Sequence, residues 1–473
     1  MTPRIVILAL GAVLSGGGAP RVVIVDLDGV RRDTLEAEYI GGRLPNVARL
    51  LGEVGNVREF ATARWYERTA TVFPTVTMAS QASIFTGVPP GRHGIPGNKW
   101  FDRETEQVVG YLDSGTVPCV YALDLFGRGG CEGGLGNRHL RTPTLYEAAT
   151  AAGKTSTVVY SQFFRGATRL VLPSLGSMMN RRKGVVDNYQ KFDVSMVDTA
   201  IATLRHDGLP DILTVYFSST DEVGHLLGIA AERICLETSV DPQLGRLLDA
   251  IESLDAGWRA NTLFVITSDH GRTDAAAAPG DRHRESQVSE LLRQAGFDGD
   301  HCQVTENGGS LYVYLRSRAA GSRWIDPPRP EDVRAAADAL SQDQALGSVT
   351  YAIAARSGGP GSGYMAFGNK SLSESTEQLL NAVDSPRSGD LIVLLSPGRY
   401  AGENSPAGAQ HGSVFENDLA VPIVLALGGV APGRTAQPIA TTDLAGIIEE
   451  YLGIRAPAGS RTLLNRNEEC LRR

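Results

Sequence analysis

The 473-residue sequence lacks any long apolar run that could cross a membrane. No internal stretch approaches the roughly 18 consecutive apolar residues that a membrane-spanning helix requires. The sequence has 45 Lys and Arg residues against 53 Asp and Glu residues, a formal net charge of −8. It also lacks a basic block of the kind that binds along a nucleic-acid backbone. We therefore expect neither an integral membrane protein nor a partner of duplex nucleic acid.

Cysteine is scarce, and none of the five cysteines forms a C-x-x-C pair. A thiolate metal site or a redox centre of that type is therefore not expected. If the chain is exported, Cys119 and Cys131 are the pair that we expect to form a disulfide, closing a short Gly-rich loop. With five cysteines, an odd one must then remain free.

The first 19 residues have the features of a secretory signal peptide. One Arg precedes an apolar run at residues 5–14, and the small residues Gly17 and Ala19 are spaced for cleavage after Ala19. The alternative is an ordinary first strand, since a second apolar run, RVVIVDLDG, begins almost at once. We favour the signal peptide for residues 1–19, which predicts a periplasmic or secreted protein without a lipid anchor, since no Cys follows the run.

Apolar runs of strand length recur along the chain, at residues 22–27, 155–160, 211–217, 261–267, 390–395 and 421–427. Between several of them lie amphipathic helix patterns such as DPQLGRLLDAIESL and TTDLAGIIEEYLGI. This alternation is typical of a mostly parallel sheet with helices on both faces. We therefore predict an α/β fold, a three-layer sandwich with a mostly parallel central sheet.

Two segments interrupt the alternation, and we interpret both as insertions into one core. Residues 99–138 are rich in Gly and turn formers, and residues 273–390 mix helical patterns, short strands and the glycine run RSGGPGSG. That run lacks the Lys-Ser/Thr of a phosphate-binding loop, so a flexible loop is favoured. The predicted domains are a core of residues 20–272 and 391–473 and an inserted cap subdomain of residues 273–390.

Acids and histidines follow three of the apolar runs. The run VVIVDLDG delivers Asp28, DILTVYFSSTDEVGH delivers Asp221 and His225, and NTLFVITSDHG delivers Asp269 and His270. Ligands of open α/β sheets collect outside the carboxyl ends of the strands, so these side chains are predicted to converge on one crevice. The i, i+4 spacing of Asp221 and His225 would place both on one face of a helical turn.

A fourth segment, AQHGSVFENDL, adds His411 to this set. Each residue taken singly has an ordinary alternative as a helix cap, a turn residue or a packed histidine. Together, three carboxylates and three imidazoles are ligands that suit zinc and similar ions. Two divalent ions would bring a charge of +4 against −3 from the acids, and the surplus would attract an anion and stabilise an alkoxide, as phosphoryl chemistry requires.

Thr77, in FPTVTMASQASIFTGV, is the candidate nucleophile. It precedes an amphipathic helix pattern, and a helix N-terminus favours anions. A free hydroxyl is a weak nucleophile at neutral pH, and metal coordination can activate it. The alternative is a plain helix cap, a role for which Thr75 and Ser80 compete.

These residues resemble the alkaline phosphatase superfamily, in particular the type I phosphodiesterase/nucleotide pyrophosphatase group and the single-chain bacterial alkaline phosphatases. Five separated motifs occur in family order: VDLDGVRRD, PTVTMASQ with TGVPPGRHGIPGNKWFD, STDEVGH, SDHG and QHG. The resemblance implies an alkaline-phosphatase-like fold with two zinc ions. The implied ligand sets are Asp221, His225 and His411 for one ion, and Asp28, Asp269 and His270 for the other, with Thr77 beside the second.

The resemblance also implies a mechanism. Thr77 would attack phosphorus in line to give a phospho-threonine intermediate, and metal-activated water would then release the product. Asn98, in GNKW, matches the family asparagine that donates a hydrogen bond to a phosphoryl oxygen. Its alternative is a turn residue after Gly97.

Departures from the family pattern bear on the substrate. Where the pyrophosphatase group commonly has Asn-His after the nucleophile, this chain has Ser80 and Gln81. In SQFFRGA, Phe163 stands where the related monoesterases carry Lys, while Arg165 keeps their Arg and is a candidate catalytic residue. A diester carries a single negative charge and a second organic group that suits an apolar wall, so Phe163 favours diesters, although it could equally pack in the core and Arg165 could be a solvated surface charge.

The predicted function is a two-metal hydrolase of small-molecule phosphoesters, of the phosphodiesterase or nucleotide pyrophosphatase type. An alkaline phosphatase acting on monoesters is the first alternative, and a metal-bound binding protein without catalysis is the alternative from another class. A sulfatase is disfavoured because TMASQ does not fit the C/S-x-P-x-R pattern. The inserted residues 273–390 are expected to cover the site and to shape the leaving-group pocket.

Overall fold

The computed structural model describes residues 18–53, 57–113, 116–123, 131–181, 186–276, 284–368, 371–402 and 408–454. Apart from Gly18 and Ala19, the predicted signal peptide lies outside the described residues, and so does Cys470. None of the described helices is long and apolar enough to span a bilayer.

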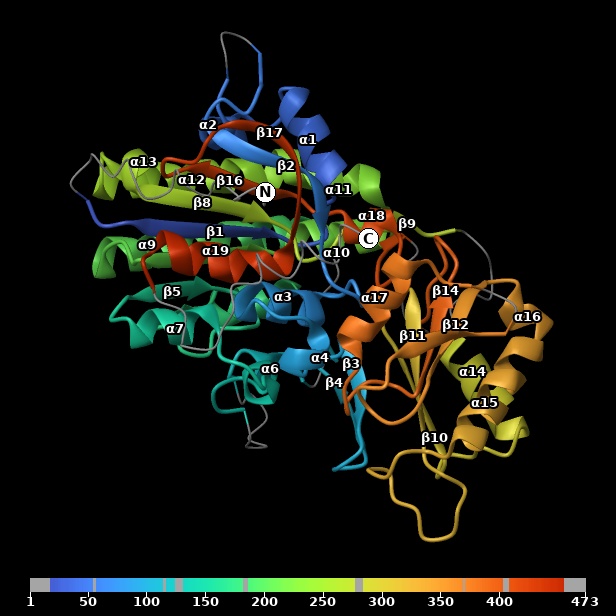
Figure 1. Ribbon diagram of the computed structural model, residues 1–473. Coiled ribbons are helices and arrows are strands. Elements are labelled where there is room, and N and C mark those ends of the chain that lie inside the picture. The colour runs from blue at the N-terminus through green and yellow to red at the C-terminus, as the bar shows by residue number, and fades with distance from the viewer. Residues whose placement is uncertain are drawn as a thin grey trace, which may run out of the picture.

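A central sheet dominates the described chain, with eight strands in the order β17-β2-β16-β8-β1-β7-β5-β6 (Figure 1). The strands are β1 (Arg21–Leu27), β2 (Ala63–Ala70), β5 (Ser156–Val159), β6 (Arg169–Val171), β7 (Ile212–Phe217), β8 (Thr262–Thr267), β16 (Ile423–Leu427) and β17 (Gly433–Ala440). Strands β8, β1, β7, β5 and β6 run parallel, and β16 is antiparallel to both of its neighbours. The predicted mostly parallel sheet is confirmed.

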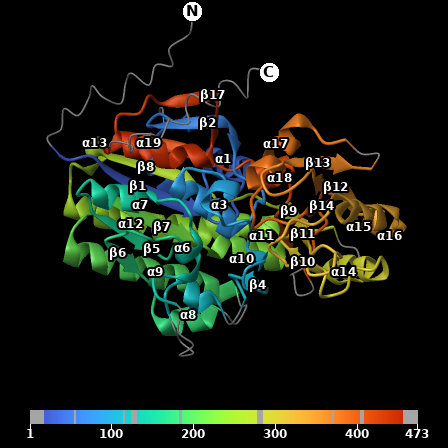
Figure 2. The ribbon, with the colours of Figure 1, turned by 60° about the horizontal axis from the view of Figure 1, so that its bottom comes forward.

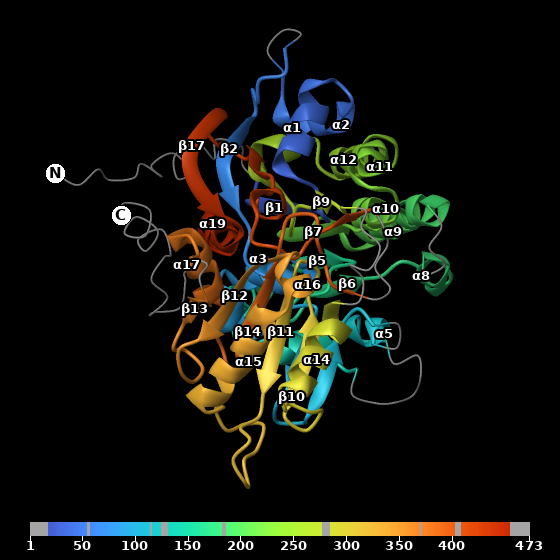
Figure 3. The same cartoon turned by 90° about the vertical axis from the view of Figure 1, so that its right-hand side faces the viewer.

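Helices cover both faces of this sheet. Figure 3 shows α9 (Val186–Asp207), α10 (Ser219–Leu227), α11 (Ile229–Cys235) and α12 (Asp241–Leu254) on one side, and α3 (Thr77–Thr86) and α19 (Leu444–Tyr451) on the other. Every residue of β7 and β8 is buried as a result. A strand covered on both faces needs apolar residues at consecutive positions, which is why these strands read as unbroken apolar runs in the sequence.

A second, smaller sheet lies beside the core and is antiparallel throughout its described pairs (Figures 1 and 2). Its order is β10-β11-β14-β12-β13. The strands are β10 (Cys302–Glu306), β11 (Ser310–Leu315), β12 (Thr350–Arg356), β13 (Tyr364–Phe367) and β14 (Leu391–Leu395), and the associated helices are α14 (Arg284–Gln294), α15 (Pro330–Gln342), α16 (Gln344–Gly347) and α17 (Glu374–Val383). We call this unit the second-sheet subdomain. It has its own apolar cluster, which includes Leu292, Leu311 and Val393.

The position of β14 differs from the prediction. We expected the apolar run at residues 390–395 to join the core, yet β14 pairs with β11 and β12 of the second sheet. A fully buried central strand has the same apolar pattern in either sheet, so the pattern alone does not tell which sheet the strand joins.

The expected insertion at residues 99–138 contains a hairpin and a disulfide. Strands β3 (Lys99–Asp102) and β4 (Gln107–Gly110) pair antiparallel. The predicted disulfide between Cys119 and Cys131 is confirmed, and Cys235 and Cys302 are free and buried. The remaining short elements are α1 (Arg32–Ile40), α2 (Pro45–Leu51), α4 (Pro90–His93), α5 (Val117–Val120), α6 (Leu135–His139), α7 (Leu145–Ala151), α8 (Leu175–Arg181), α13 (Trp258–Asn261), α18 (Glu416–Leu419), β9 (Thr273–Asp274) and β15 (Ala409–Gln410).

Candidate metal centre

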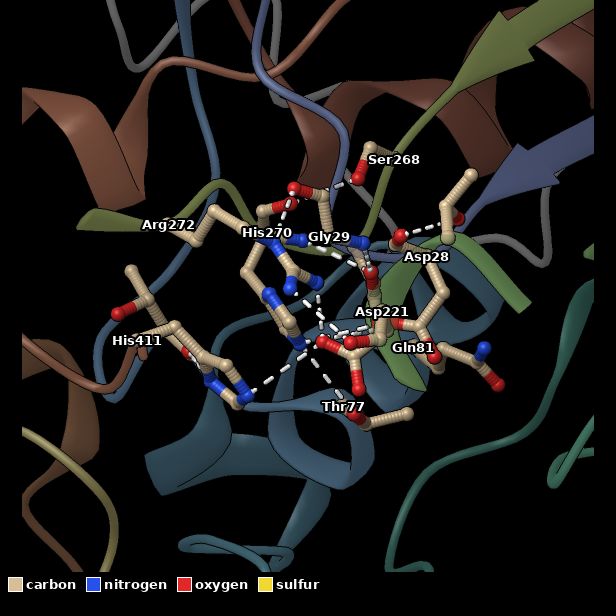
Figure 4. Close-up of polar contacts among 12 residues, drawn as sticks. Asp28, Gly29, Thr77, Gln81, Asp221, Ser268, His270, Arg272 and His411 are labelled. Carbon is tan, nitrogen blue, oxygen red and sulfur yellow. Dashed lines mark hydrogen bonds and ion pairs between the residues drawn. The ribbon is translucent and has the colours of Figure 1, made fainter. Parts of the chain in front are cut away.

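The carboxyl ends of β1, β7 and β8 meet at one edge of the central sheet, because β1 pairs in parallel with both of the others. Asp28 follows β1, and Asp269 and His270 follow β8. Helix α10 begins just after β7 and carries Asp221 and His225. The structure therefore brings together the acids and histidines that the sequence predicted would converge (Figure 4).

The first group of candidate ligands consists of Asp221, His225 and His411. His225 Nε2 lies 3.2 Å from Asp221 Oδ2 and 3.1 Å from His411 Nε2. His411 Nε2 lies 3.7 Å from Asp221 Oδ1. The i, i+4 spacing on α10 does place Asp221 and His225 on one face, and His411 reaches them from the residues after β15.

The second group surrounds His270 Nε2. This atom lies 3.5 Å from Asp28 Oδ1, 3.6 Å from Asp269 Oδ2 and 3.3 Å from Thr77 Oγ1. Asp221 also lies close enough to form a ligand group with Asp28 and His270. Asp221 thus stands between the two groups, and the His270 and His411 rings stack with centroids 3.7 Å apart.

Hydrogen bonds from Nδ1 fix the orientation of the three imidazoles. Each Nδ1 bonds a backbone carbonyl: His225 that of Ala409 (3.0 Å), His411 that of Thr75 (2.8 Å) and His270 that of Gly271 (3.0 Å). A carbonyl oxygen can only accept, so each Nδ1 carries a proton, and the neutral form of each ring presents the lone pair of its Nε2 to the site. This is the arrangement in which histidines bind metals.

Two buried carboxylate oxygens at the site, Asp28 Oδ1 and Asp269 Oδ2, have no hydrogen-bond partner in the described part of the chain. Buried polar atoms are nearly always partnered, so these two oxygens fit a role as cation ligands. Tetrahedral nitrogen and oxygen ligands at about 2.0–2.1 Å from zinc lie about 3.3–3.4 Å apart. The separations within both groups are close to this value, and the residues present therefore fit two divalent ions.

Charge at the site is unbalanced in the absence of cations. Burial raises the pKa of Asp28 well above its usual value, and the nearby charges of Asp221 and Asp269 raise it further. Burial also raises the pKa of Asp269, although His270 opposes the shift. Burial acts the same way on Asp221, but His225 and Arg272 hold its pKa well below the usual value. Cations between these carboxylates would relieve their repulsion.

Thr77 is the first residue of α3, and Val76 occupies the cap position, so Thr77 is not the helix cap. Its hydroxyl points at His270 (Figure 4). Thr75 has a different role, because its Oγ1 donates to the Ser413 carbonyl (2.9 Å) and accepts from the Gly412 N–H (3.0 Å). These bonds tie the strand-to-helix loop before Thr77 to the segment that carries His411.

Asn98 lies beside the start of α3. Its Oδ1 accepts a hydrogen bond from the backbone N–H of Met78, the residue after Thr77, at 2.9 Å. Its Nδ2 has no acceptor among the residues that the structure describes and is therefore available to a ligand. This placement is consistent with a donor to a phosphoryl oxygen near Thr77.

The geometry of Arg165 and Phe163 differs from what we expected of them. The Arg165 guanidinium donates to Glu147 Oε2 (3.0 Å) and to the carbonyls of Asn137 (2.9 Å), Leu140 (3.0 Å) and Thr142 (2.5 Å). Its hydrogen-bond donors therefore hold local structure, and few of them remain for a substrate. The Phe163 side chain is fully buried in the main core cluster and offers no apolar wall to a ligand.

Arg272, which directly follows SDHG, was not predicted from the sequence. Its fully buried guanidinium contacts Asp221 Oδ1, donates to the Gly29 carbonyl (3.2 Å) and pairs with Glu232 (2.7 Å). A Cβ at Gly29 or at Gly224 would lie within 2 Å of the Arg272 guanidinium, so the guanidinium fits because both positions are glycine. The only sequence signals were a basic residue after SDHG and the glycines in DLDG and DEVG.

The family model for type I phosphodiesterase / nucleotide pyrophosphatase matches residues 22–413. Alkaline phosphatase PhoD of Zymomonas mobilis is 26% identical over 270 residues, which cover 54% of this chain and less than half, 45%, of PhoD. Alkaline phosphatase PhoV of Synechococcus elongatus is 24% identical over 408 residues, which cover 83% of this chain and 70% of PhoV.

Solved structures share the fold. The crystal structure of alkaline phosphatase PafA aligns with a TM-score of 0.68 at 18% identity, covering 94% of this chain and 98% of PafA. Murine ectonucleotide pyrophosphatase/phosphodiesterase 5 aligns with a TM-score of 0.61 at 16% identity, covering 94% and 98%. The predicted α/β sandwich and the resemblance are confirmed, and the chain belongs to the type I phosphodiesterase/nucleotide pyrophosphatase family.

Proposed function

We propose that the chain is a two-metal phosphoester hydrolase in which Thr77 is the nucleophile. The observation that carries the proposal is the convergence of the Thr77 hydroxyl, three histidine Nε2 atoms and three buried carboxylates at one sheet edge. The names of the relatives support a phosphoester substrate, since PhoD, PhoV and PafA are alkaline phosphatases.

The residues divide into two ligand sets in this proposal. Asp221, His225 and His411 hold one ion, and Asp28, Asp269 and His270 hold the other. Imidazole and carboxylate sets of this kind suit zinc. When bound, the ions activate the threonine hydroxyl and neutralise the departing oxygen.

Thr77 Oγ1 gives up its proton to solvent and forms the new bond to phosphorus, in line with the bond to the leaving oxygen. That second P–O bond breaks, and the leaving oxygen takes up a proton from solvent. Water then cleaves the phospho-threonine and restores the hydroxyl. Asn98 Nδ2 donates to a phosphoryl oxygen as negative charge builds on it. The fixed Nδ1 bonds of the three imidazoles keep the ligands in place through both steps.

A cleft of about 1040 Å³ supports a substrate with a sizeable organic group. It runs between the core and the second-sheet subdomain, and its lining includes Lys99, Tyr189 and His225 from the core and Glu285, Arg293 and Phe297 from the subdomain. Because His225 is a candidate ligand, the cleft begins at the site. Ligand pockets commonly have about 300–1,000 Å³, so the second ester group of a diester fits here.

The cleft supports the diesterase or pyrophosphatase type and a cap role for the inserted residues 273–390. Phe163 contributes nothing to this preference, because it lies in the core. An alkaline phosphatase is the second candidate, favoured by the names of the curated relatives. A binding protein without catalysis is disfavoured, because the nucleophile and all six ligands are present together.

We also propose that the protein works in the periplasm or outside the cell. The Cys119–Cys131 disulfide supports this location, because disulfides persist in oxidising compartments.

The test compares bis(p-nitrophenyl) phosphate with p-nitrophenyl phosphate, with added zinc and with chelator. We expect chelator-sensitive turnover, higher on the diester, and a loss of about 1,000-fold or more in Thr77→Ala. Thr77→Ser keeps a hydroxyl and should retain part of the activity. Thr86→Ala, at the far end of the same helix, is the matched control, since among the described residues its Oγ1 bonds the Ala82 carbonyl (2.6 Å) and no group of the site.

The results distinguish the candidate functions. Thr77→Ala with more than a tenth of wild-type activity would exclude Thr77 as the nucleophile. Preference for the monoester would favour the alkaline phosphatase. Two bound zinc ions without turnover of either ester would favour the binding protein.

A further inference from the structure

We propose that Asn307, in the second-sheet subdomain, is a positioning residue that holds Asn98 where its amide can donate to the phosphoryl group. The inference rests on the proposed function and adds a residue to it. Asn307 lies in the turn between β10 and β11, and its side chain is 1% exposed.

The Asn307 side chain forms hydrogen bonds with the backbone of Asn98 and of Lys99. Its Oδ1 accepts from the N–H of Asn98 (2.8 Å) and from the N–H of Lys99 (3.2 Å). Its Nδ2 donates to the carbonyl of Lys99 (2.9 Å). Two N–H groups and one carbonyl thus define the orientation of the amide, which offers both an acceptor and a donor.

Asn98 is consequently held from two directions. Asn307 fixes its backbone, and the Met78 N–H fixes its Oδ1. Because Met78 directly follows Thr77, the same contact sets the distance between the Asn98 amide and the nucleophile. The remaining group, Nδ2, does not take part in the bond to Met78 and has no acceptor among the described residues.

The turn that contains Asn307 also touches the other side of the site. The Gly309 N–H donates to the carbonyl of His411 at 2.8 Å. A Cβ at Gly308 would lie 2.1 Å from that carbonyl oxygen, and a Cβ at Gly97 would lie 2.3 Å from Asn307 Oδ1. One turn of the subdomain therefore packs tightly against both the Asn98 segment and the His411 segment.

Asn307 provides one of several contacts that attach the subdomain to this part of the core. Other contacts cross the same boundary: Tyr312 Oη donates to the Pro96 carbonyl (2.9 Å), and Arg387 Nη1 donates to the carbonyls of Gly94 (2.7 Å) and His139 (2.8 Å). Tyr312→Phe is therefore a matched control. It removes one bond from the subdomain to the same loop, two residues before Asn98, and leaves the bonds of Asn98 intact.

The test is a double-mutant cycle on zinc-loaded protein with bis(p-nitrophenyl) phosphate and p-nitrophenyl phosphate. A displacement of a catalytic group by about 1 Å can cost about 100-fold in rate, so we expect Asn307→Ala to lower kcat by about 10–100-fold with little change in KM. In an Asn98→Ala background the same substitution should change kcat by less than about twofold, because the group that it positions is gone.

Asn307→Ser is the second variant and guards against a folding defect in Asn307→Ala, because it brings no charge into the buried turn. Its hydroxyl can accept from an N–H of this segment but cannot make all three bonds of the amide, so its kcat should fall between wild type and Asn307→Ala. Zinc content and thermal midpoint are measured for each variant, and Tyr312→Phe should keep wild-type kcat.

The results separate this inference from the proposed function. A kcat of Asn307→Ala within twofold of wild type, or an equal loss in both backgrounds, would overturn the positioning role while leaving the site intact. A similar loss of kcat in Tyr312→Phe would also overturn the positioning role. Weakening any contact between the subdomain and the core would then be enough to lower kcat. A zinc-loaded wild type without turnover would overturn the proposed function together with this role.

Discussion

Asp193 is a buried acid beneath the helix that carries two candidate ligands. It lies on α9, is fully buried, and accepts hydrogen bonds from Ser219 and from Ser239 (3.2 Å). Ser219 is the first residue of α10, which carries Asp221 and His225. Burial raises the pKa of Asp193 to about 7 from an ordinary value of 3.8. This shift predicts how the stability of the protein depends on pH.

The sign follows from proton binding. Between the two pKa values the folded protein keeps the Asp193 proton and the unfolded chain loses it, so this group stabilises the folded state at low pH. The contribution is lost as the pH rises through the folded pKa. With pKa values of about 7 and 3.8, it is about 3 kcal/mol at pH 5 and close to zero at pH 8.

Asp193→Asn removes the ionisable group and keeps an oxygen that can accept from both serines. The difference in unfolding free energy, variant minus wild type, should therefore rise by about 3 kcal/mol between pH 5 and pH 8. Urea unfolding of both proteins at the two pH values measures it. Excess chelator is present throughout, so that pH-dependent metal binding does not enter the comparison.

Asp187→Asn is the control, because Asp187 is an exposed carboxylate in the first turn of the same helix. It reports the effect of losing a carboxylate from α9 without burial. A pH-independent difference for Asp193→Asn would refute the reasoning, since the carboxyl would then ionise equally in the folded and unfolded states.

Two further predictions concern buried charge and the disulfide, and a third concerns the ions. Arg272→Met should lower the unfolding free energy by about 3–5 kcal/mol, because it leaves Glu232 buried without its guanidinium, and adding Glu232→Leu should recover part of the loss in urea unfolding. Reduction of the Cys119–Cys131 disulfide, which closes a loop with a sequence separation of 12, should lower it by about 3 kcal/mol, and the Cys119→Ala/Cys131→Ala variant should not respond to reductant. Chelation should lower the thermal midpoint, and added zinc should restore it, because ions that bind only the folded state stabilise it.

The central sheet could be predicted from the sequence because its environment is simple. Strands such as β7 and β8 are buried on both faces, so every position must be apolar, and the pattern is visible without any knowledge of partners. The acids at the carboxyl ends of the strands could be predicted for a related reason. A charged residue directly after a fully apolar strand must lie at the edge of the sheet, because the strand determines its position whichever residues surround it.

Assignments that depend on partners were not predictable in the same way. Strand β14 has the pattern of a core strand and joins the second sheet. Phe163 and Arg165 occupy motif positions, yet one packs in the core and the other bonds backbone carbonyls. In each case the sequence shows the chemical character of the side chain, whereas its role depends on contacts formed only in the folded chain.

Asn307 and Asn98 show where this limit matters for function. They are 209 positions apart, and an Asn next to two glycines reads as an ordinary turn residue. Metal ligands can be recognised because few residue types bind metals, but a residue that positions another needs only one donor and one acceptor. Since such residues come from the subdomain as well as the core, the inserted segment has to be treated as part of the site, and its removal should impair catalysis as well as substrate preference.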